Sequence, residues 1–274
     1  MTGERGSPAF RLAVHGAMIL LSLLAIFPLW WMIATSLRPE GEVFSTALFP
    51  AAPTLENYRA ALEALPMPRI LWNTFAMAAL TAAAQAASGL LAAYALVFWR
   101  FRGARTAQLL IALSWLVPFQ VVMIPNYVLA TRLGMLDSLA GLVIPNAAAA
   151  FAVLLMVNAL RSFPKEIVEA ARMDGAGSLR ILVEVIVPNL RAPLASLGVL
   201  AFISAWNEYF WPLLLIRRME ASVVQIGLQF FMTQEGNDWG PLMAAATMAS
   251  LPILALYLVL HRQVIDSFMR SGIR

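Results

Sequence analysis

Six apolar runs, each close to the length of a membrane span, dominate the sequence. They cover approximately residues 14–37, 71–99, 107–129, 139–160, 194–216 and 241–260. A hydrocarbon core about 30 Å thick is crossed by about 20 helical residues at 1.5 Å per residue. The runs lack the alternation of polar and apolar residues that is found in barrel strands. The sequence therefore predicts an all-α membrane protein, with six transmembrane helices in a single domain of residues 1–274.

The composition agrees with a chain that lies in lipid. Charged residues make up 12% of the sequence, whereas they make up about 25% of an ordinary soluble domain. The first apolar run is longer than a signal-peptide core and lacks a small-residue cleavage site, so we expect it to be retained as the first span. The chain has no cysteine, which excludes disulfides, thiolate metal sites and cysteine nucleophiles.

The basic residues are distributed unevenly around the apolar runs. If the N-terminus is inside, the inner segments hold thirteen of the nineteen: Arg5, Arg11, Arg100, Arg102, Arg105, Arg161, Lys165, Arg172, Arg180, Arg191, Arg262, Arg270 and Arg274. Because cytoplasmic loops retain positive charge, we expect a multi-pass protein of the inner membrane with both termini in the cytoplasm. The net charge of +4 comes from these flanks and gives no reason to expect a nucleic-acid partner.

Prolines recur inside the apolar runs. They are Pro28, Pro118, Pro125, Pro145, Pro212 and Pro252. Each removes one backbone donor and loosens its helix locally, which suits a pathway that moves. The alternative is that membrane helices simply tolerate proline. No internal repeat is evident, and this weakens the case for the inverted-repeat folds of many secondary transporters.

One inner loop, residues 161–193, is too charged to cross the bilayer and too long to be only a turn. Pro164 before a lysine and a glutamate predicts the start of a helix. Gly175 or Gly177 can take the left-handed conformation that ends such a helix, and Ser178 is placed to cap a second one. The loop is therefore expected to contain a short helix, a glycine turn and a second amphipathic helix.

The first of these helices has a face of small and apolar residues, Ile167, Ala170 and Ala171, which would let a partner approach closely. A charged rim surrounds it, formed by Glu169, Arg172, Asp174, Arg180 and Glu184. Two of these pairs, Glu169 with Arg172 and Arg180 with Glu184, are also spaced for intrahelical ion pairs. The alternative to a docking face is an amphipathic segment that rests on the lipid headgroups.

This loop resembles the Glu-Ala-Ala loop of binding-protein-dependent ABC importer permeases. Glu169, Ala170, Ala171, Asp174, Gly175 and Pro188 stand at the family spacing, and Val185 and Val187 replace the usual isoleucine and leucine. The resemblance extends over nearly the whole chain, including residues 54–58, residues 205–209 and the tail beyond His261. It is strongest to the shorter, six-span partner in the carbohydrate and glycerol-phosphate group of maltose-type systems.

The resemblance implies the type I ABC importer permease fold, with this loop as a cytoplasmic coupling helix that docks in a groove of the ATPase. The residues implied in ATPase coupling are Glu169, Ala170, Ala171, Arg172, Asp174, Gly175 and Pro188. It also implies a second, different permease subunit, two ATPase subunits or domains and an extracytoplasmic solute-binding protein. ATP and magnesium would be bound by the ATPase, with no cofactor on this chain.

Glu208 is the only formal charge within a predicted span, and a carboxylate there is expensive unless it faces water or a partner. At helical spacing Ser204, Asn207, Glu208 and Trp211 share a face, with Trp206 and Tyr209 beside it. Hydrogen-bonding groups next to aromatic rings suit a sugar. The alternative is that Asn207 and Glu208 bond neighbouring helices or lie near the outer rim.

Other polar residues at membrane depth are Asn73, Gln85, Gln120, Asn126, Asn146 and Asn158. Contacts between helices explain each of them better than a solute pathway does. Gln120 and Asn126, beside the prolines of the third span, are the preferred pathway candidates. The tail from Arg262 is cationic with apolar residues, so lipid contact, ATPase contact and disorder all stay open, and the resemblance favours the ATPase.

An enzymatic function has little support. The only histidines, His15 and His261, lie at span ends, so a histidine-rich metal site or a serine triad is hard to build. The sole lysine, Lys165, does not follow a glycine-rich loop, so a nucleotide cradle is missing. We expect no catalytic or metal site here, and ATP hydrolysis by another chain.

Three functions are therefore considered. The first is the permease of an ATP-driven importer for a sugar or sugar-like solute, or alternatively for glycerol phosphate or a related phosphodiester. The second is a secondary transporter coupled to an ion through Glu208, and the third is a membrane scaffold without transport. The Glu-Ala-Ala loop favours the importer, because neither alternative has a use for it.

Overall fold

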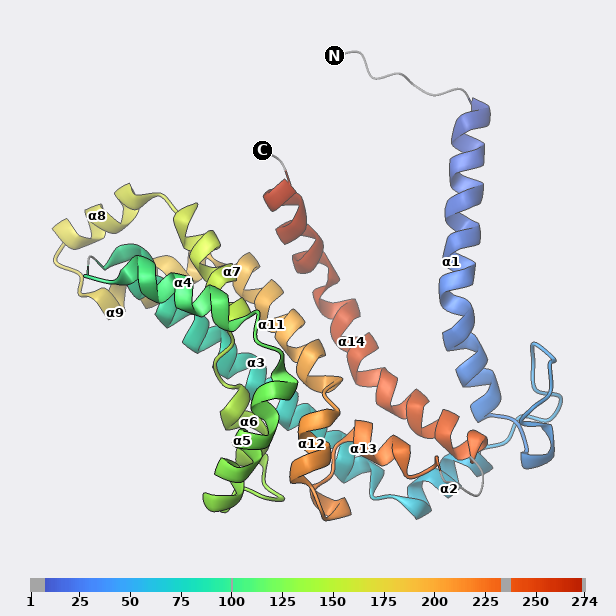
Figure 1. Ribbon diagram of the computed structural model, residues 1–274. Coiled ribbons are helices and arrows are strands. Elements are labelled where there is room, and N and C mark those ends of the chain that lie inside the picture. Colours follow the sequence, from blue (N-terminus) through green and yellow to red (C-terminus); the bar gives the residue numbers. More distant parts are fainter. Residues whose placement is uncertain (1–7, 100, 233–237, 273–274) are drawn as a thin grey trace. The chain divides into compact units, whose positions relative to one another are not determined.

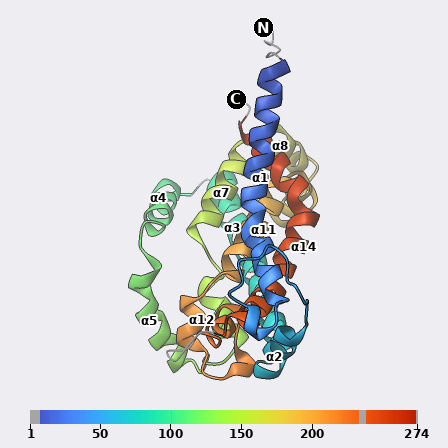
Figure 2. The same cartoon turned by 90° about the vertical axis from the view of Figure 1, so that its right-hand side faces the viewer.

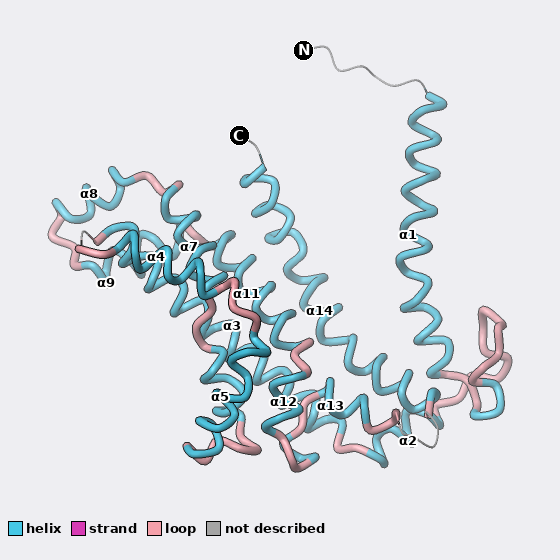
Figure 3. Tube along the Cα trace, viewed as in Figure 1, coloured by secondary structure: helices cyan, strands magenta, loops and turns pink. Residues whose placement is uncertain are grey.

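The computed structural model describes residues 8–99, 101–232 and 238–272, with the side chains of residues 9–99, 101–232 and 238–259. Arg5, Arg100 and Arg274 of the charge count lie outside the described residues, and so do the side chains of the tail from His261. Every regular element of the described part is a helix (Figures 1 and 3). The all-α expectation is therefore confirmed for these residues. Contacts group the chain into two compact units, residues 1–67 with 228–251, and residues 68–227 with 252–274.

The first unit contains α1 (Pro8–Ser36), η1 (Glu40–Glu42), α2 (Glu56–Ala64) and the first part of α14 (Trp239–Gly272). Nearly all side chains of α1 are exposed and apolar up to Trp30. Asn57 of α2 donates to the carbonyls of Ser36 (3.0 Å) and Arg38 (2.7 Å) just after α1. Gly240 packs so closely on Asn57 that a Cβ there would lie 2.3 Å from the amide oxygen. These contacts fasten α2 and the start of α14 to the end of α1.

The second unit holds the helices from α3 to the first part of α13, and the later part of α14. In chain order they are α3 (Met67–Phe98), α4 (Ala104–Ser114), α5 (Phe119–Arg132), α6 (Leu139–Val143), η2 (Ile144–Asn146), α7 (Ala150–Arg161), α8 (Lys165–Met173), α9 (Ser178–Arg180), the π-type η3 (Ile181–Ile186), α10 (Val187–Asn189), α11 (Arg191–Trp206), α12 (Phe210–Leu215), η4 (Met219–Ala221) and α13 (Val224–Gln229). Both α4 and α11 pack against α7, and Figures 1 and 2 show α7 and α11 side by side. The core of this unit is built from buried residues of α3, α7, α8, η3 and α11.

Three helices are each long and apolar enough to span a bilayer, over residues 9–36, 67–98 and 239–259. Three further pairs of helices reach that length if each bent pair is counted as one span. These are α4 with α5, bent by 96°, residues 139–146 with α7, bent by 49°, and residues 178–189 with α11, bent by 82°. The expected ranges 107–129 and 139–160 therefore correspond to bent pairs. The third pair begins inside the loop 161–193 that is expected in the cytoplasm, so only α11 of that pair falls within the expected range 194–216.

Proline chemistry explains where two of the apolar runs break. Pro118 disfavours helical backbone in the residue before it, and α4 ends at Ser114; Pro118 itself is extended (φ −61°, ψ 135°) and stands just before α5. Within the expected range 194–216, α11 ends at Trp206 and α12 starts at Phe210. Pro212 cannot donate to the carbonyl of Glu208, four residues earlier, and its ring would clash there. In contrast, Pro125 is accommodated inside α5.

Candidate solute pathway and coupling segment

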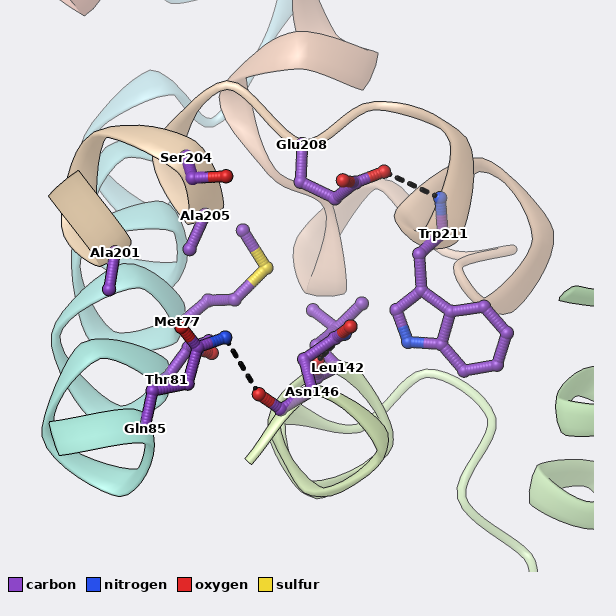
Figure 4. Close-up of a pocket in the computed structure, with 10 residues that line it drawn as sticks. All are labelled: Met77, Thr81, Gln85, Leu142, Asn146, Ala201, Ser204, Ala205, Glu208 and Trp211. Atoms are coloured by element: carbon purple, nitrogen blue, oxygen red, sulfur yellow. Dashed lines mark hydrogen bonds between the residues drawn. The ribbon is translucent and has the colours of Figure 1, made fainter. Parts of the chain in front are cut away.

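A cavity opens in the second unit between α3, the α6–η2 turn, α11 and α12 (Figure 4). Ten residues line it: Met77, Thr81, Gln85, Leu142, Asn146, Ala201, Ser204, Ala205, Glu208 and Trp211. Hydroxyl, amide and carboxylate groups thus stand beside an indole ring and aliphatic side chains. This mixture offers hydrogen bonds to a polyhydroxylated molecule and an apolar surface for its carbon skeleton.

Glu208 lies in the break between α11 and α12. Its Oε1 accepts the backbone N–H of Trp211 at 3.2 Å, which satisfies one of the donors that a helix start leaves free. The carboxylate is half-buried and faces the cavity (Figure 4). The sequence-based prediction assumed one continuous helix here, with a shared face of Ser204, Asn207, Glu208 and Trp211. That assumption was wrong, because the helix does not continue through residues 207–209.

Trp211 joins α12 to α6. Its indole N–H donates to the carbonyl of Gly141 at 3.0 Å, and the side chain is 1% exposed. Gly141 has no room for a side chain, because a Cβ would lie 2.2 Å from the carbonyl oxygen of Met135. The ring of Trp211 also makes an edge contact with Phe119 (6.2 Å between centroids). The wall of the cavity that α12 and α6 form is therefore closely packed.

The opposite wall is α3, which holds the turn between η2 and α7. The side-chain amide of Gln85 donates to the carbonyl of Asn146 at 2.9 Å, and the Ser88 hydroxyl donates to the carbonyl of Ala147 at 2.8 Å. Asn146 in turn donates to the carbonyl of Leu142 at 3.1 Å. Gln85 and Asn146 thus make helix contacts and line the cavity at the same time.

A second hollow lies further toward the start of α3. It is lined by Arg69, Asn73, Asp137, Leu139, Leu142, Arg218, Glu220 and Ala221. Leu142 is shared by both linings and is 2% exposed, so it separates the two spaces. The lining residues of α3 (Arg69, Asn73, Met77, Thr81 and Gln85) recur every four positions, which places them along one face of the helix.

Asp137 organises the loop beside this second hollow. Its Oδ1 accepts the backbone N–H groups of Arg217 (2.7 Å) and Arg218 (3.0 Å), and its Oδ2 lies 3.7 Å from Nε of Arg218. The bonds from the two backbone N–H groups hold the pKa of the Asp137 carboxyl below its usual value. Asp137 is also the one non-glycine residue with positive φ (53°) in the part of the chain that the structure describes.

The structure brings some of the expected pathway residues together and leaves others apart. Ser204, Glu208 and Trp211 meet at the cavity. Trp206 is buried and stacks on Phe202. Asn207 is exposed; its side-chain amide donates to the carbonyl of Ile203 (2.8 Å), and its Oδ1 accepts a hydrogen bond from Gln225 (3.4 Å). Gln120 is exposed and Asn126 half-buried on α5, and neither lines the cavity. Sequence reasoning missed Met77, Thr81 and Leu142, although the four-residue spacing along α3 was visible.

Residues 165–190, called the coupling segment below, begin with α8. The N–H of Gly175 bonds to the carbonyl of Arg172, and the N–H of Ala176 bonds to the carbonyl of Ala171 (both 3.0 Å). This pair of bonds is a Schellman motif, which requires a left-handed residue. Gly175 provides it with φ +78°. Gly177 has φ −70° and precedes α9 as its N-cap; assigning the cap to Ser178 was therefore wrong by one residue.

The coupling segment has a buried side and an exposed side. Val168, Ile181, Leu182 and Ile186 join the core with residues of α3 and α7. The Tyr94 hydroxyl of α3 donates to the carbonyl of Ser178 at 3.2 Å. The exposed side carries apolar residues: Ile167 (43% exposed), Met173 (88%), Leu179 (70%) and Val183 (54%). The segment is thus anchored to the helices of the second unit and presents an apolar surface outward.

The motif residues occupy both sides of this segment. Glu169, Ala170, Arg172, Asp174, Gly175 and Pro188 are exposed, whereas Ala171 is half-buried against the core. The expected apolar face of Ile167, Ala170 and Ala171 is therefore divided, because Ala171 turns inward beside Val168. Arg180 and Glu184 form the intrahelical pair, at 2.8 Å, with both side chains more than half exposed. Such an exposed pair adds little stability.

Comparison with known proteins places these features in a family. Residues 85–270 match the family described as the binding-protein-dependent transport system inner membrane component. The sn-glycerol-3-phosphate transport system permease protein UgpE of Escherichia coli O6:K15:H31 is 31% identical over 267 residues, covering 94% of this chain and 95% of that protein. The UgpE protein of Brucella abortus (strain 2308) is 28% identical, covering 96% and 98%.

A solved structure shows the same architecture. A chain of a bacterial ABC transporter involved in the import of the acidic polysaccharide alginate matches with a TM-score of 0.78 and 26% identity, over 96% of this chain and 99% of that chain. The expected type I ABC importer permease fold and the role of permease subunit are confirmed. The ion-coupled carrier and the scaffold are not supported. This chain belongs to the family of inner membrane components of binding-protein-dependent transport systems.

Proposed function

We propose that this chain carries a sugar or sugar-like solute across the inner membrane after an extracytoplasmic binding protein has delivered it, and that a separate ATPase supplies the energy. Glycerol phosphate is the alternative solute, and the names of the relatives favour it. ATP and magnesium are assigned to the ATPase. The other proposed partners are a second, different permease subunit and two ATPase subunits or domains.

The exposed apolar side of the coupling segment carries the proposal. Met173 and Leu179 are 88% and 70% exposed, and apolar side chains exposed to this degree in adjacent turns mark an interaction surface. The buried side of the same segment packs on α3 and α7. An ATPase that binds the exposed side therefore displaces α3 and α7 when it moves the segment. The small exposed residue Ala170 leaves room for close approach.

The cavity supports a polyhydroxylated solute. The Ser204 hydroxyl, the Glu208 carboxylate and the Gln85 amide offer donors and acceptors near the ring of Trp211. A carboxylate at membrane depth is retained where it faces water or a ligand. Gln120, Asn126 and Asn207 do not line this cavity, and we assign them to the wider pathway that forms with the second permease. Trp206 is buried against Phe202, and we assign it to packing behind the cavity.

The course of α3 supports the proposed orientation. Its last residue, Phe98, is near the coupling segment, because the carbonyl of Phe98 lies 3.5 Å from Nη2 of Arg172. Its first turns line the second hollow, and 32 helical residues extend over about 48 Å. With the coupling segment in the cytoplasm, the second hollow faces outward, and six spans leave both termini in the cytoplasm. The tail from Arg262 is then available to the ATPase.

Charge placed on the apolar surface tests the docking proposal. Met173→Asp and Leu179→Asp should each abolish copurification of the ATPase and ATP-driven uptake, while the chain still inserts. Glu184→Gln is the matched control, since Glu184 is exposed in the same segment and only pairs with Arg180. Uptake is measured in proteoliposomes with the purified binding protein. Normal ATPase recovery with both aspartate variants would contradict the proposal.

A further inference from the structure

The loop after α1, residues 39–50, turns back alongside the end of the helix (Figure 1). Arg38, at the base of the loop, is fully buried. Its guanidinium donates to the backbone carbonyls of Ser45 and Ala47 and lies over the ring of Trp31, with Cζ 4.7 Å from the ring centroid. The charge is thus surrounded by carbonyl dipoles and an aromatic face from the same loop and helix.

A buried cation is costly unless it is well partnered. Within the described ranges no carboxylate forms an ion pair with Arg38. The arginine therefore serves to hold the loop backbone. Thr54 adds a bond from its N–H to the carbonyl of Leu37 (2.8 Å), and Asn57 bonds the carbonyl of Arg38 (2.7 Å). The loop is consequently a fixed structure with a fixed outer surface.

That outer surface carries large apolar side chains, with the exposed Glu40 at its start. Phe44 is 81% exposed, Leu48 is 55% exposed and Phe49 is 67% exposed. Trp30 of α1 ties them to the helix, because its indole N–H donates to the carbonyl of Leu48 at 3.1 Å and its ring makes an edge contact with Phe49 (5.2 Å). An apolar side chain of α1 is therefore in direct contact with the apolar residues of the loop. We call residues 39–50 the aromatic hook.

The depth of Trp30 indicates what covers the hook. From Val14, where the predicted span begins, to Trp30 the helix rises about 24 Å, so Trp30 lies about one helical turn short of the far side of a hydrocarbon core about 30 Å thick. Trp30 is then close to the boundary between acyl chains and headgroups, where tryptophan is enriched. We propose that the aromatic hook lies in this boundary layer, with Phe44 and Phe49 in lipid, and anchors the extracytoplasmic end of α1 to the outer leaflet.

Because the chain contains no cysteine, a single cysteine introduced in the hook can be spin-labelled selectively. Phe44→Cys carries a nitroxide in the assembled transporter in nanodiscs, and Glu56→Cys, exposed on α2 beyond the hook, is the control. The nitroxide at position 44 should collide readily with oxygen and poorly with a water-soluble nickel chelate, and the control should show the reverse. Leu48→Cys replaces Phe44→Cys if the latter fails to assemble.

Two results would overturn the proposal. Collision with the nickel chelate at position 44 would place the hook in water, and protection from both reagents would mean that protein covers it, either the second permease or the binding protein. Arg38→Gln supplies an independent check, because it removes the clamp without touching the exposed surface. It should raise nickel accessibility at position 44 several-fold while α1 remains inserted; unchanged accessibility would show that Arg38 does not hold the hook.

Discussion

Substitution of Gly175 tests whether the turn of the coupling segment transmits force. The φ of Gly175 is +78°, and a Cβ added there would meet no atom within 4 Å. Any penalty therefore comes from the backbone alone. A left-handed conformation costs an ordinary L-residue about 1–2 kcal/mol, which shifts the equilibrium away from the closed turn by about 5- to 30-fold. A β-branched residue suffers more than this.

The amount of solute imported per ATP hydrolysed should decrease in the order wild type, Gly175→Asn, Gly175→Ala, Gly175→Val. Asparagine comes first among the variants because, of these three side chains, it tolerates the left-handed region best. Opening the turn breaks the two bonds of the Schellman motif, so α8 no longer moves as one body with η3. The assay is the ratio of solute imported to ATP hydrolysed, in proteoliposomes with the binding protein. For Gly175→Val this ratio should fall at least tenfold, with normal insertion.

Gly177 provides the matched control. It lies two residues away with φ −70° and ψ 160°, a conformation open to any residue, and it also has free space around its Cβ position. Gly177→Val should therefore keep the coupling ratio within about twofold, since no left-handed strain arises. A wild-type ratio for Gly175→Val, or equal losses for both valine variants, would refute the reasoning from backbone conformation.

Three further substitutions test the cavity. Glu208→Gln keeps an oxygen for the backbone N–H at the start of α12 but loses the charge, so it should change the KM for solute, and unchanged kinetics would assign Glu208 a structural role. Leu142→Ala should join the two hollows and let solute leak through liposomes without ATP. Leu139 lines only the second hollow, so the Leu139→Ala protein should not leak. Equal leak through both variants would contradict the separation of the two hollows by Leu142. Gly141→Ala should lower the Tm in detergent by several degrees, because its Cβ would overlap the carbonyl of Met135, whereas Gly198→Ala in an open position should not.

Features set by local backbone chemistry could be read from the sequence. The left-handed turn at Gly175 and the start of α8 after Pro164 depend on one or two residues each, and the structure contains both. The break at Glu208 is partly of the same kind, since Pro212 four residues later cannot donate to the carbonyl of Glu208 and so disfavours a continuous helix, although Pro125 inside α5 shows that a proline alone does not decide the matter. It was missed because an uninterrupted apolar run was taken as an uninterrupted helix.

Features set by tertiary packing could not be read in this way. Met77 and Thr81 are ordinary residues of an apolar helix, and only the approach of α11 and the α6–η2 turn makes them walls of a cavity. Likewise, the sequence favours a packing role for Gln85, and only the structure shows that it both bonds the carbonyl of Asn146 and lines the cavity. A helix as apolar as α3 gives little indication of which face meets its neighbours.

The course of α3 connects the two candidate sites. Gln85 lines the cavity and holds the η2–α7 turn, and Tyr94, nine residues later and about 14 Å along the helix, bonds the coupling segment at Ser178. A closed packing core lies between these two bonds, formed by α3, α7 and the buried side of the coupling segment. Close-packed interiors transmit displacement instead of absorbing it. We therefore expect a displacement of the coupling segment to reach the cavity wall through α3 itself, without any need for a flexible link.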